Sequence, residues 1–280
     1  MTVSYDIEDL YQKLPKRRED SHKGTYGKVL VIAGSRNMCG AAYLSAKAAY
    51  RTGAGLVYIY TEECNRVILQ QLLPEAVLYT YEEDTWEPEA MLRLLADKDA
   101  VIIGPGFGRS LLKKRMLEIV LEYPQTARIL DADALNLLAE TPKLWEQKKG
   151  ELIITPHLKE MERISESSVK EIAADMEKSA KEFSGKYQVI TVLKNARTIV
   201  SDGKNCYRNT SGNHGMATGG SGDVLSGVIG ALLAQGMTLF EAAKLGVYIH
   251  GLAGDAARDA RGAYSVMASD IVDYILRGIS

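Results

Sequence analysis

Short apolar runs alternate with amphipathic stretches along most of the chain, and this alternation constrains the fold more than any other feature. The apolar runs are predicted strands at residues 28–33, 56–60, 101–103, 128–130, 152–154 and 189–193. A strand that is apolar throughout is buried on both faces, which is typical of a parallel sheet with helices on either side. A helix predicted at 41–51 joins the first two strands and completes a βαβ unit.

The later part of the chain adds a hairpin and several helices. The runs 198–201 and 205–207 flank an Asp-Gly-Lys tripeptide, a pattern typical of a β-hairpin. From Asp223 onward the chain has mostly helical spacing. No linker and no internal repeat interrupts the 280 residues. We therefore expect a single α/β domain over residues 1–280, with a mostly parallel central sheet flanked by helices.

Charge and composition exclude several classes of protein. The net charge of −2 gives no electrostatic reason to expect nucleic acid or an anionic membrane as a partner. Glycine or charge interrupts every long apolar stretch, and the acidic N-terminus lacks the regions of a signal peptide, so we expect a cytoplasmic protein that binds no membrane. The three cysteines, Cys39, Cys64 and Cys206, have no Cys-x-x-Cys spacing, which indicates reduced thiols.

A glycine-rich run at 213–223, Asn-His-Gly-Met-Ala-Thr-Gly-Gly-Ser-Gly-Asp, directly precedes an apolar helical stretch. Residues 219–222 are predicted to form the turn into that helix and to leave its first backbone N–H groups free for an anion such as phosphate. Asp223 would lie beside the anion, where a carboxylate could accept a proton from an attacking hydroxyl. The alternative is a tight turn closed by a capping aspartate. The run matches neither the Walker motif nor the dinucleotide fingerprint, which favours a phosphate-handling enzyme of another lineage.

Glycines and polar residues also follow two of the predicted strands, where ligands bind in open parallel sheets. Gly104 and Gly106 lack side chains and would let a flat ligand lie against the backbone. Asp131, Asp133 and Asn136 could orient polar ligand groups or waters bound to Mg²⁺. The alternative for Asp133 is that it only caps the helix that it precedes.

Two cationic or titratable side chains follow other strands. His157 comes after a strand and beside a glutamate, and its two interpretations are a ligand contact and an ordinary structural histidine. Lys194 ends the strand at 189–193. It is a candidate contact to a nucleotide phosphate, and the alternative is a solvated surface lysine.

Taken in order along the chain, these segments resemble the NAD(P)H-hydrate dehydratase family. The resemblance rests on residues 22–28, 40–42, 51–57, 104–106, 131–136, 155–157, 192–194, 212–223, 245–255 and 269–271. It implies a ribokinase-like three-layer α/β fold. It also implies that the 280 residues correspond to the dehydratase alone, without the epimerase domain that accompanies this activity in some members.

The resemblance implies a repair reaction on damaged nicotinamide cofactors. Members of this family use ADP, or ATP in eukaryotic members, to phosphorylate the ring hydroxyl of the S epimer of hydrated NADH or NADPH (NADHX or NADPHX). Phosphate then leaves, which restores NAD(P)H and releases AMP and phosphate. The implied partners are therefore these substrates, Mg²⁺ and a separate NAD(P)HX epimerase.

The resemblance also implies roles for individual residues. Asp223 corresponds to the catalytic base and to a substrate contact. The other implied substrate contacts are Ala41, Gly104, Gly106 and His157. The implied nucleotide contacts are Lys194, Asn195, Ala196, Arg197, Thr198, Gly219, Gly220, Ser221 and Gly222. No metal ligand is implied. Asn195 and Lys159 each stand where the family usually has glycine, and Lys159 adds a charge beside His157.

Two other functions share part of this pattern. A ribokinase-like kinase of a small alcohol would use the same glycine turn but would stop at the phosphorylated product, in a small and closed pocket. A nucleotide-binding regulator without chemistry would have no need for the carboxylate of Asp223.

Apolar residues near the C-terminus exceed the number that one sheet face obviously needs. They are Tyr248, Ile249, Leu252, Ile271, Tyr274 and Ile275. We therefore expect a homo-oligomer, and the resemblance implies a tetramer. The alternative is that one large core absorbs all of them.

Overall fold

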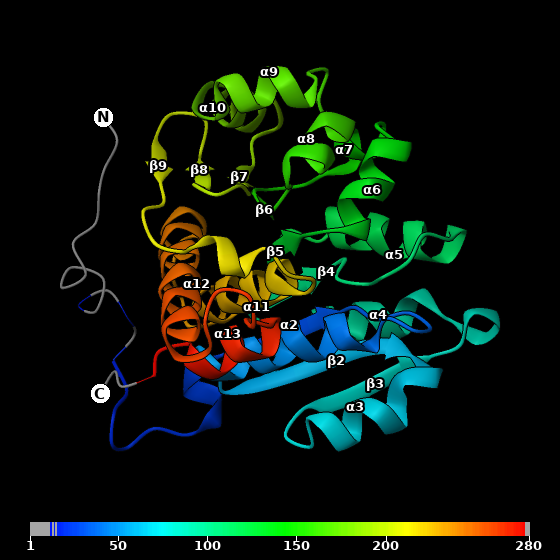
Figure 1. Cartoon of the computed structure of the whole chain (residues 1–280). Helices are drawn as coiled ribbons and strands as arrows, with labels where there is room; N and C mark the ends of the chain where they lie inside the picture. The colour runs from blue at the N-terminus through cyan, green and yellow to red at the C-terminus, as the bar shows by residue number, and fades with distance from the viewer. Residues whose placement is uncertain (1–11, 13, 15, 278–280) are drawn as a thin grey trace.

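A nine-stranded sheet lies at the centre of the computed structural model, which describes residues 12, 14 and 16–277 (Figure 1). Its strands are β1 (Lys28–Ile32), β2 (Leu56–Glu62), β3 (Val77–Tyr81), β4 (Ala100–Ile103), β5 (Ala127–Leu130), β6 (Ile153–Ile154), β7 (Ile190–Leu193), β8 (Ile199–Ser201) and β9 (Cys206–Arg208). Their order is β3-β2-β1-β4-β5-β6-β7-β8-β9. The pairs from β3 to β7 are parallel, and β8 and β9 continue the sheet as an antiparallel hairpin. The acidic N-terminal residues lie outside the described part of the chain.

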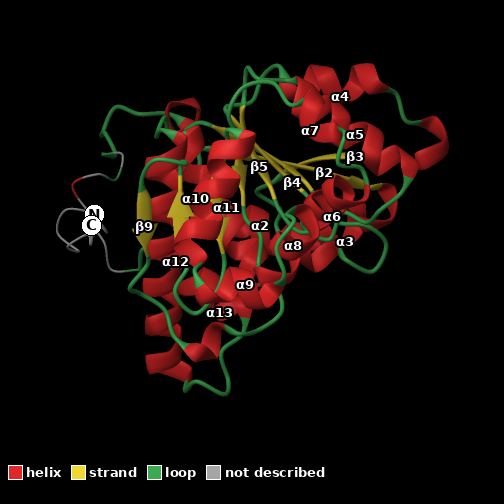
Figure 2. Cartoon of the chain, turned by 90° about the horizontal axis from the view of Figure 1, so that it is seen from above, coloured by secondary structure: helices red, strands yellow, loops and turns green. Residues whose placement is uncertain are grey.

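Helices cover both faces of the sheet, and Figure 2 shows them around the central strands. One face is covered by α2 (Cys39–Arg51), α3 (Arg66–Leu72), α11 (Ser221–Ala234), α12 (Leu239–Arg261) and α13 (Ala268–Tyr274). The other is covered by α4 (Pro88–Leu95), α5 (Leu111–Glu122), α6 (Asp133–Glu140), α7 (Leu144–Gln147), α8 (Leu158–Ile164), α9 (Val169–Ala174) and α10 (Met176–Tyr187). Short 3₁₀ turns, η1 (Lys23–Tyr26), η2 (Glu63–Asn65), η3 (Glu83–Thr85) and η4 (His214–Met216), complete the elements.

The side chains of β1 alternate between the two cores. Val29 and Val31 belong to the core beneath α11, whereas Leu30 and Ile32 belong to the core on the opposite face. All four are fully buried. This strand is therefore apolar throughout because helices cover it on both sides, which confirms the expected three-layer α/β fold.

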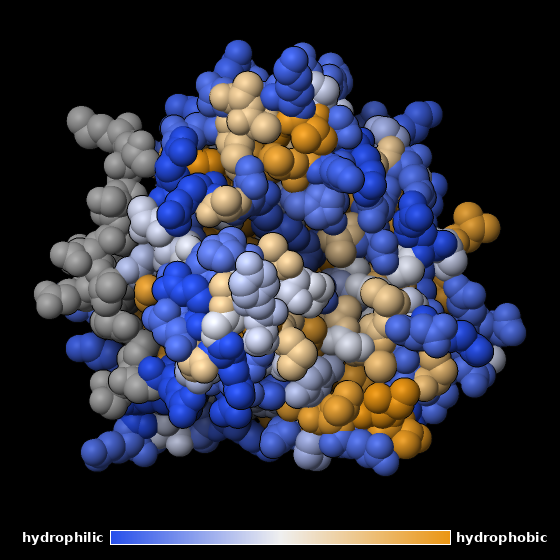
Figure 3. All heavy atoms as spheres, viewed as in Figure 1, coloured by the Kyte–Doolittle hydropathy of each residue, from blue (hydrophilic) through white to orange (hydrophobic). Residues whose placement is uncertain are grey.

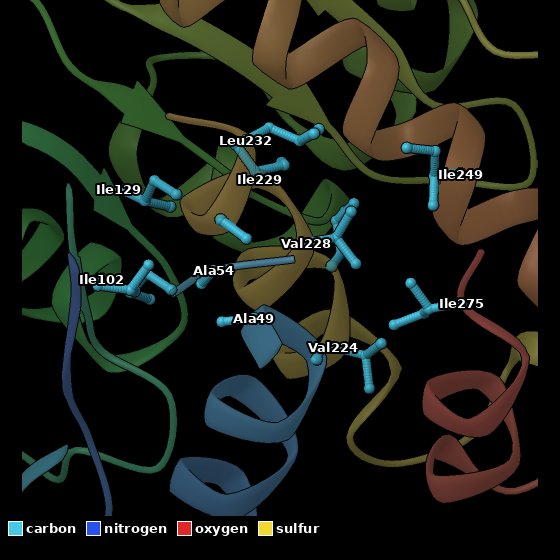
Figure 4. Close-up of a cluster of buried hydrophobic side chains, with 14 of the residues drawn as sticks. Ala49, Ala54, Ile102, Ile129, Val224, Val228, Ile229, Leu232, Ile249 and Ile275 are labelled. Carbon is cyan, nitrogen blue, oxygen red and sulfur yellow. The ribbon is translucent and has the colours of Figure 1, made fainter. Parts of the chain in front are cut away.

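Helix α11 lies inside the first core. Its residues from Val224 to Ala234 are buried. Figure 4 shows Val228 and Ile229 among apolar side chains that include Ile102 of β4. A helix that is apolar on all sides is typical of a position inside a protein, since no face of it needs to be polar.

Two glycines let neighbouring elements approach α11 closely. A Cβ atom at Gly227 would lie 2.1 Å from the backbone oxygen of Ser45 in α2, and one at Gly230 would lie 2.6 Å from Cδ1 of Ile102. Neither position has room for a side chain. The packing on α2 and on the sheet therefore determines where the N-terminus of α11 lies.

The sequence predictions agree with most of these elements. Each predicted strand and the hairpin occur with small shifts at their ends, of which the largest is the extension of β2 to Glu62. The helix expected at 41–51 begins earlier, at Cys39. Strand β3 was not predicted, because at the edge of the sheet its residues alternate between exposed and partly buried positions instead of forming a buried run.

The interpretation of the C-terminal apolar residues was wrong for most of them. Tyr248, Ile249, Ile271 and Ile275 are buried within the core of this chain, so they form no exposed surface. Exposed apolar side chains lie instead on α3, among them Val67, Ile68 and Leu72. Figure 3 shows a hydrophobic patch in the region of this helix. In the described residues, no helix combines the length and the apolar character needed to cross a membrane.

Candidate functional site

The N-terminus of α11 forms a cradle of backbone groups. Gly220 precedes the helix with φ +90°, and no side chain caps the first turn. A Cβ atom at Gly220 would lie 2.4 Å from Cδ1 of Leu44, so only glycine fits this conformation and this space. The helix begins at Ser221, which places Gly222 in its first turn rather than in the preceding turn as expected. The uncapped N–H groups and the helix dipole suit a phosphate.

Asp223 is the third residue of this helix and is partly buried. Burial and the negative charge of Asp131 raise its pKa to about 7, although the ammonium group of Lys194 acts in the opposite direction. Asp223 forms no ion pair within the described part of the chain. A carboxyl with this pKa can accept and release a proton near neutral pH, as a general base must.

Lys194 lies beside the cradle but is held by buried carboxylates. Its Nζ atom is 2.8 Å from Oδ1 of Asp131 and 3.9 Å from Oε2 of Glu160. A Cβ atom at Gly222 would lie 3.2 Å from the same Nζ. Burial disfavours the charged lysine, but the two carboxylates outweigh this effect and raise its pKa. The alternative of a solvated surface lysine is therefore wrong.

Both oxygens of the Asp131 carboxylate accept hydrogen bonds from protein groups. Oδ1 accepts a hydrogen bond from Nζ of Lys194, and Oδ2 accepts one of 2.7 Å from Oγ of Ser226. Its side chain is 1% exposed. Because each oxygen already binds a protein group and the side chain is almost fully buried, the structure gives no support for the suggestion that this aspartate orients waters on Mg²⁺. Asp133 accepts a hydrogen bond from the N–H of Gly108, and the N-cap of α6 is Ala132.

His157 caps the next helix along the chain. Its Nδ1 atom accepts hydrogen bonds of 3.1 Å from the N–H groups of Lys159 and Glu160, and the carboxylate of Glu160 accepts the N–H of His157 in return. Because Nδ1 is an acceptor, we assign the ring proton to Nε2, which lies 3.5 Å from Oε1 of Glu160. Burial and the charge of Lys194 lower the pKa of His157 and keep it neutral.

The segment from Lys194 to Thr198 joins β7 to β8. Oδ1 of Asn195 accepts the N–H of Ala196, and Arg197 donates to the backbone oxygen of Thr210. Asn195, which replaces the usual glycine, therefore stabilises the bend of this segment. The N–H of Lys194 donates to the oxygen of Pro156, and this bridge brings the segment beside His157.

A cavity of about 1160 Å³ connects these groups. Among the predicted site residues its lining includes His157, Lys194, Asn195, Ala196, Arg197, Thr198, Ser221, Gly222 and Asp223. Its volume lies somewhat above the usual range for ligand pockets, roughly 300–1,000 Å³. It therefore has room for more than one small substrate.

Asp131 also lines this cavity, whereas Ala41, Gly104, Gly106, Gly219 and Gly220 do not; packing explains why Gly104 and Gly106 are glycines. Gly104 has φ +125°, and a Cβ atom there would lie 1.8 Å from the backbone oxygen of Asp131. Gly106 has φ +54° and packs against Ala41, which is buried. These contacts are one reason for glycine at both positions, and the expectation that a flat ligand lies against their backbone stays a prediction. Gly219 and Gly220 belong to the turn before α11 and likewise do not line the cavity.

His250 is a residue of the site that the sequence analysis did not single out. It lies in α12, lines the cavity and has Nε2 3.4 Å from Oγ of Ser221. Burial lowers its pKa to about 4, so the ring is neutral at physiological pH. His250 falls within the segment 245–255 that supports the family resemblance. The sequence around it shows only a buried position in a helix and does not reveal its contact with Ser221.

Comparison with known proteins identifies the family of this chain. The sequence profile of the NAD(P)H-hydrate dehydratase family matches residues 29–277. The bifunctional NAD(P)H-hydrate repair enzyme of Coxiella burnetii is 40% identical over 268 residues, which are 95% of this chain and 53% of that protein. The chain thus spans about half the length of such bifunctional relatives. The ADP-dependent (S)-NAD(P)H-hydrate dehydratase of Neisseria meningitidis is 39% identical over 91% of this chain and 86% of its own length.

Solved structures give the same result. The ADP/ATP-dependent NAD(P)H-hydrate dehydratase of Bacillus subtilis, co-crystallised with ATP and Mg²⁺, superposes with a TM-score of 0.83 and 33% identity over 96% of this chain and 95% of that one. A hydroxyethylthiazole kinase of Pyrococcus horikoshii has a TM-score of 0.63 but only 14% identity over 96% and 92% of the two chains, which shows the shared ribokinase-like fold alone. The chain belongs to the NAD(P)H-hydrate dehydratase family.

Proposed function

We propose that this chain is an ADP-dependent dehydratase that converts the S epimer of NADHX or NADPHX to NADH or NADPH, with release of AMP and phosphate. The observation that carries the proposal is the partly buried carboxylate of Asp223 in the first turn of the uncapped helix α11. A base beside a phosphate cradle is what phosphorylation of a hydroxyl requires. The names of the relatives support this substrate class.

In the proposed reaction Asp223 accepts the proton of the ring hydroxyl. The hydroxyl oxygen bonds to the terminal phosphorus of ADP while the bond from that phosphorus to the bridging oxygen of AMP breaks. The carbon–oxygen bond of the new phosphate ester then breaks with loss of a ring proton, which frees phosphate and restores the dihydropyridine. The N–H groups of α11 and the ammonium of Lys194 would stabilise the charge on the transferred phosphate.

We propose Mg²⁺ as the accompanying ion, carried by the nucleotide. Among the described residues, no group of three or more His, Cys, Asp or Glu side chains could hold a metal ion. Mg²⁺ commonly keeps several waters and binds through substrate phosphates, so the residues fit an ion that enters with ADP. When bound, it supplies positive charge to the phosphates.

The test is an assay with ADP, Mg²⁺ and NADHX that follows both the return of the dihydropyridine absorbance and the release of phosphate. We expect both signals in equal amounts, and a much slower reaction for Asp223→Asn. Asp99→Asn is the matched control, because Asp99 accepts the N–H of Lys28 at the opposite end of β1. Accumulation of a phosphorylated ring without NADH would indicate a kinase, and absence of any turnover with retained ADP binding would indicate a regulator.

We also propose the location, the phosphoryl donor and the assembly of this protein, on the basis of its family. The chain would act as a single dehydratase domain in the cytoplasm, together with a separate NAD(P)HX epimerase that supplies the S epimer. ADP is proposed as the donor because several relatives are named ADP-dependent. The proposed assembly is a homotetramer.

A further inference from the structure

The carboxylate of Asp131 connects three separate elements of the site. Asp131 follows β5, and its two oxygens accept hydrogen bonds from Lys194, which follows β7, and from Ser226 in α11. These partners lie 63 and 95 residues away in sequence. The distances of 2.8 and 2.7 Å are short, as expected for hydrogen bonds to a buried charged group.

Both partners lie next to the groups that would handle phosphate. Ser226 is three residues after Asp223, so the two lie on neighbouring turns of one side of α11. The Nζ atom of Lys194 is close to Gly222 in the cradle. One carboxylate therefore holds the lysine and the first turns of the helix relative to each other.

The same contact determines which carboxylate Lys194 pairs with. A lysine side chain is flexible, and the charges of three carboxylates raise the pKa of Lys194. They belong to Asp131, Glu160 and Asp223. Lys194 forms ion pairs with the first two, whereas Asp223 has none among the residues that the structure describes. An ammonium group bound directly to Asp223 would oppose its use as a base, because the positive charge would hold the carboxylate in its ionised form.

We propose that Asp131 is a positioning residue: it keeps the ammonium of Lys194 at the phosphate cradle and away from Asp223, and through Ser226 it holds the first turns of α11 against that lysine. The expected effect of Asp131 on turnover rests on the proposed function. The expected effect of Asp131 on ADP binding does not depend on that function.

The experiment is a double-variant cycle with ADP as the probe, measured by calorimetry. Lys194→Met in the natural background should weaken ADP binding about tenfold or more, because a charged contact to phosphate is lost. In a protein that already carries Asp131→Asn, adding Lys194→Met should weaken ADP binding by less than about threefold relative to Asp131→Asn alone, since the lysine is no longer held at the cradle. An equal or larger loss in the Asp131→Asn background would overturn the proposal.

The second measurement is turnover. Asp131→Asn should lower kcat about 10–100-fold at saturating ADP, and Ser226→Ala, which leaves the Asp131–Lys194 pair intact, should lower it about 3–10-fold without changing the affinity for ADP. A purely structural role would lower the active fraction without a change in the turnover of the folded protein. Thermal denaturation and Asp99→Asn, at the other end of the sheet, control for folding. If Ser226→Ala has the same kcat as the natural protein, the claim that Asp131 acts on α11 through Ser226 is overturned.

If the unchanged protein has no dehydratase activity, the proposed function fails while the calorimetric cycle still decides the role of Asp131. If the protein is active and the cycle shows independent losses, the positioning role fails and the function stands. The two results are therefore distinguishable.

Discussion

At Asp223 the surroundings, rather than the residue type, produce the chemistry. Burial and the charge of Asp131 raise its pKa to about 7, far above that of a solvated aspartic acid. If Lys194 were paired directly with Asp223, it would lower the pKa of this aspartate more strongly than it does from its present position. Asp131 holds the lysine instead. A carboxyl in this state is a stronger base than a solvated carboxylate, and about half of it is ionised at neutral pH.

The first prediction is that dehydration requires the ionised form of Asp223. We expect kcat/KM to fall as the pH decreases below about 7, since the carboxylate becomes protonated there. Asp223→Asn should lower turnover by ~10²–10⁴-fold while ADP affinity is retained, because the amide has nearly the same shape. Steady-state kinetics across the pH range and calorimetry provide the measurements. A flat pH profile, or near-natural turnover of the variant, would assign the proton to another group.

The second prediction concerns stability at the same residue. The pKa of Asp223 is raised in the folded state, so its favourable contribution is complete below about pH 4 and is lost as the pH rises through about 7. Asp223→Asn removes this ionisation. The shift corresponds to at most about 4 kcal/mol, which partial exposure of the side chain reduces, so we expect the variant to be more stable than the natural protein by roughly 2–4 kcal/mol near pH 8 and to show no gain near pH 4. Thermal denaturation at both pH values tests this, and an equal difference at the two would refute it.

At the scale of the element, α11 joins the core to the site. Its apolar residues pack against α2 and the sheet, and its first turn presents the cradle and Asp223. The packing at Gly227 and Gly230 leaves no room for the helix to shift toward α2 or β4. The core of the protein thus holds the anion site at a defined place above the strands.

The third prediction compares two adjacent glycines before this helix. Gly220 has a positive φ, and a Cβ atom there would press on Leu44 and Ala268, whereas a Cβ atom at Gly219 would meet nothing within 4 Å. We expect Gly220→Ala to destabilise the protein by about 1–3 kcal/mol and Gly219→Ala to change its stability by less than about 0.5 kcal/mol. Denaturant unfolding measures both variants. Equal losses would mean that the turn is less constrained than its contacts indicate.

At the scale of the whole molecule, one cavity brings part of the expected nucleotide site together with two of the expected substrate contacts. The segment after β7 lies at this cavity with His157 and Asp223, on loops that come from different parts of the chain. The sheet order places β5, β6 and β7 side by side, so their carboxyl ends converge on the N-terminus of α11.

The fourth prediction is that both substrates bind before chemistry occurs. Direct transfer from ADP to the ring hydroxyl requires both ligands in the 1160 Å³ cavity at once. We expect intersecting lines in double-reciprocal plots and no phosphorylated protein. Parallel lines, with a labelled phosphate trapped on Asp223 in the absence of NADHX, would instead make this carboxylate a nucleophile.

The fifth prediction is the proposed tetramer, for which the buried C-terminal residues give no support. The exposed apolar patch on α3 is a better candidate for a contact surface, since such patches often mark interfaces. We expect light scattering to give about four times the mass of one chain, and Ile68→Glu to reduce that mass. A monomer at micromolar concentration would contradict the tetramer, and a tetrameric variant would place the interface elsewhere.

The sequence alone determined the layered α/β fold, the glycine turn and the candidate base. These features are local: a strand covered on both faces is apolar throughout, a helix has its own spacing, and a turn needs glycine where φ is positive. Strand β3 was missed because its pattern depends on being at the sheet edge, which is not a local property.

Only the tertiary structure decided how the charged groups of the site combine. The contacts of Asp131 with Lys194 and Ser226 span 63 and 95 residues, and His250 reaches Ser221 from another helix. Such pairs depend on the order of the strands and on the packing of α11 and α12, and no short stretch of sequence records that order. The protonation state of Asp223 likewise depends on the tertiary structure, because burial and the charge of a neighbour distant in sequence set its pKa.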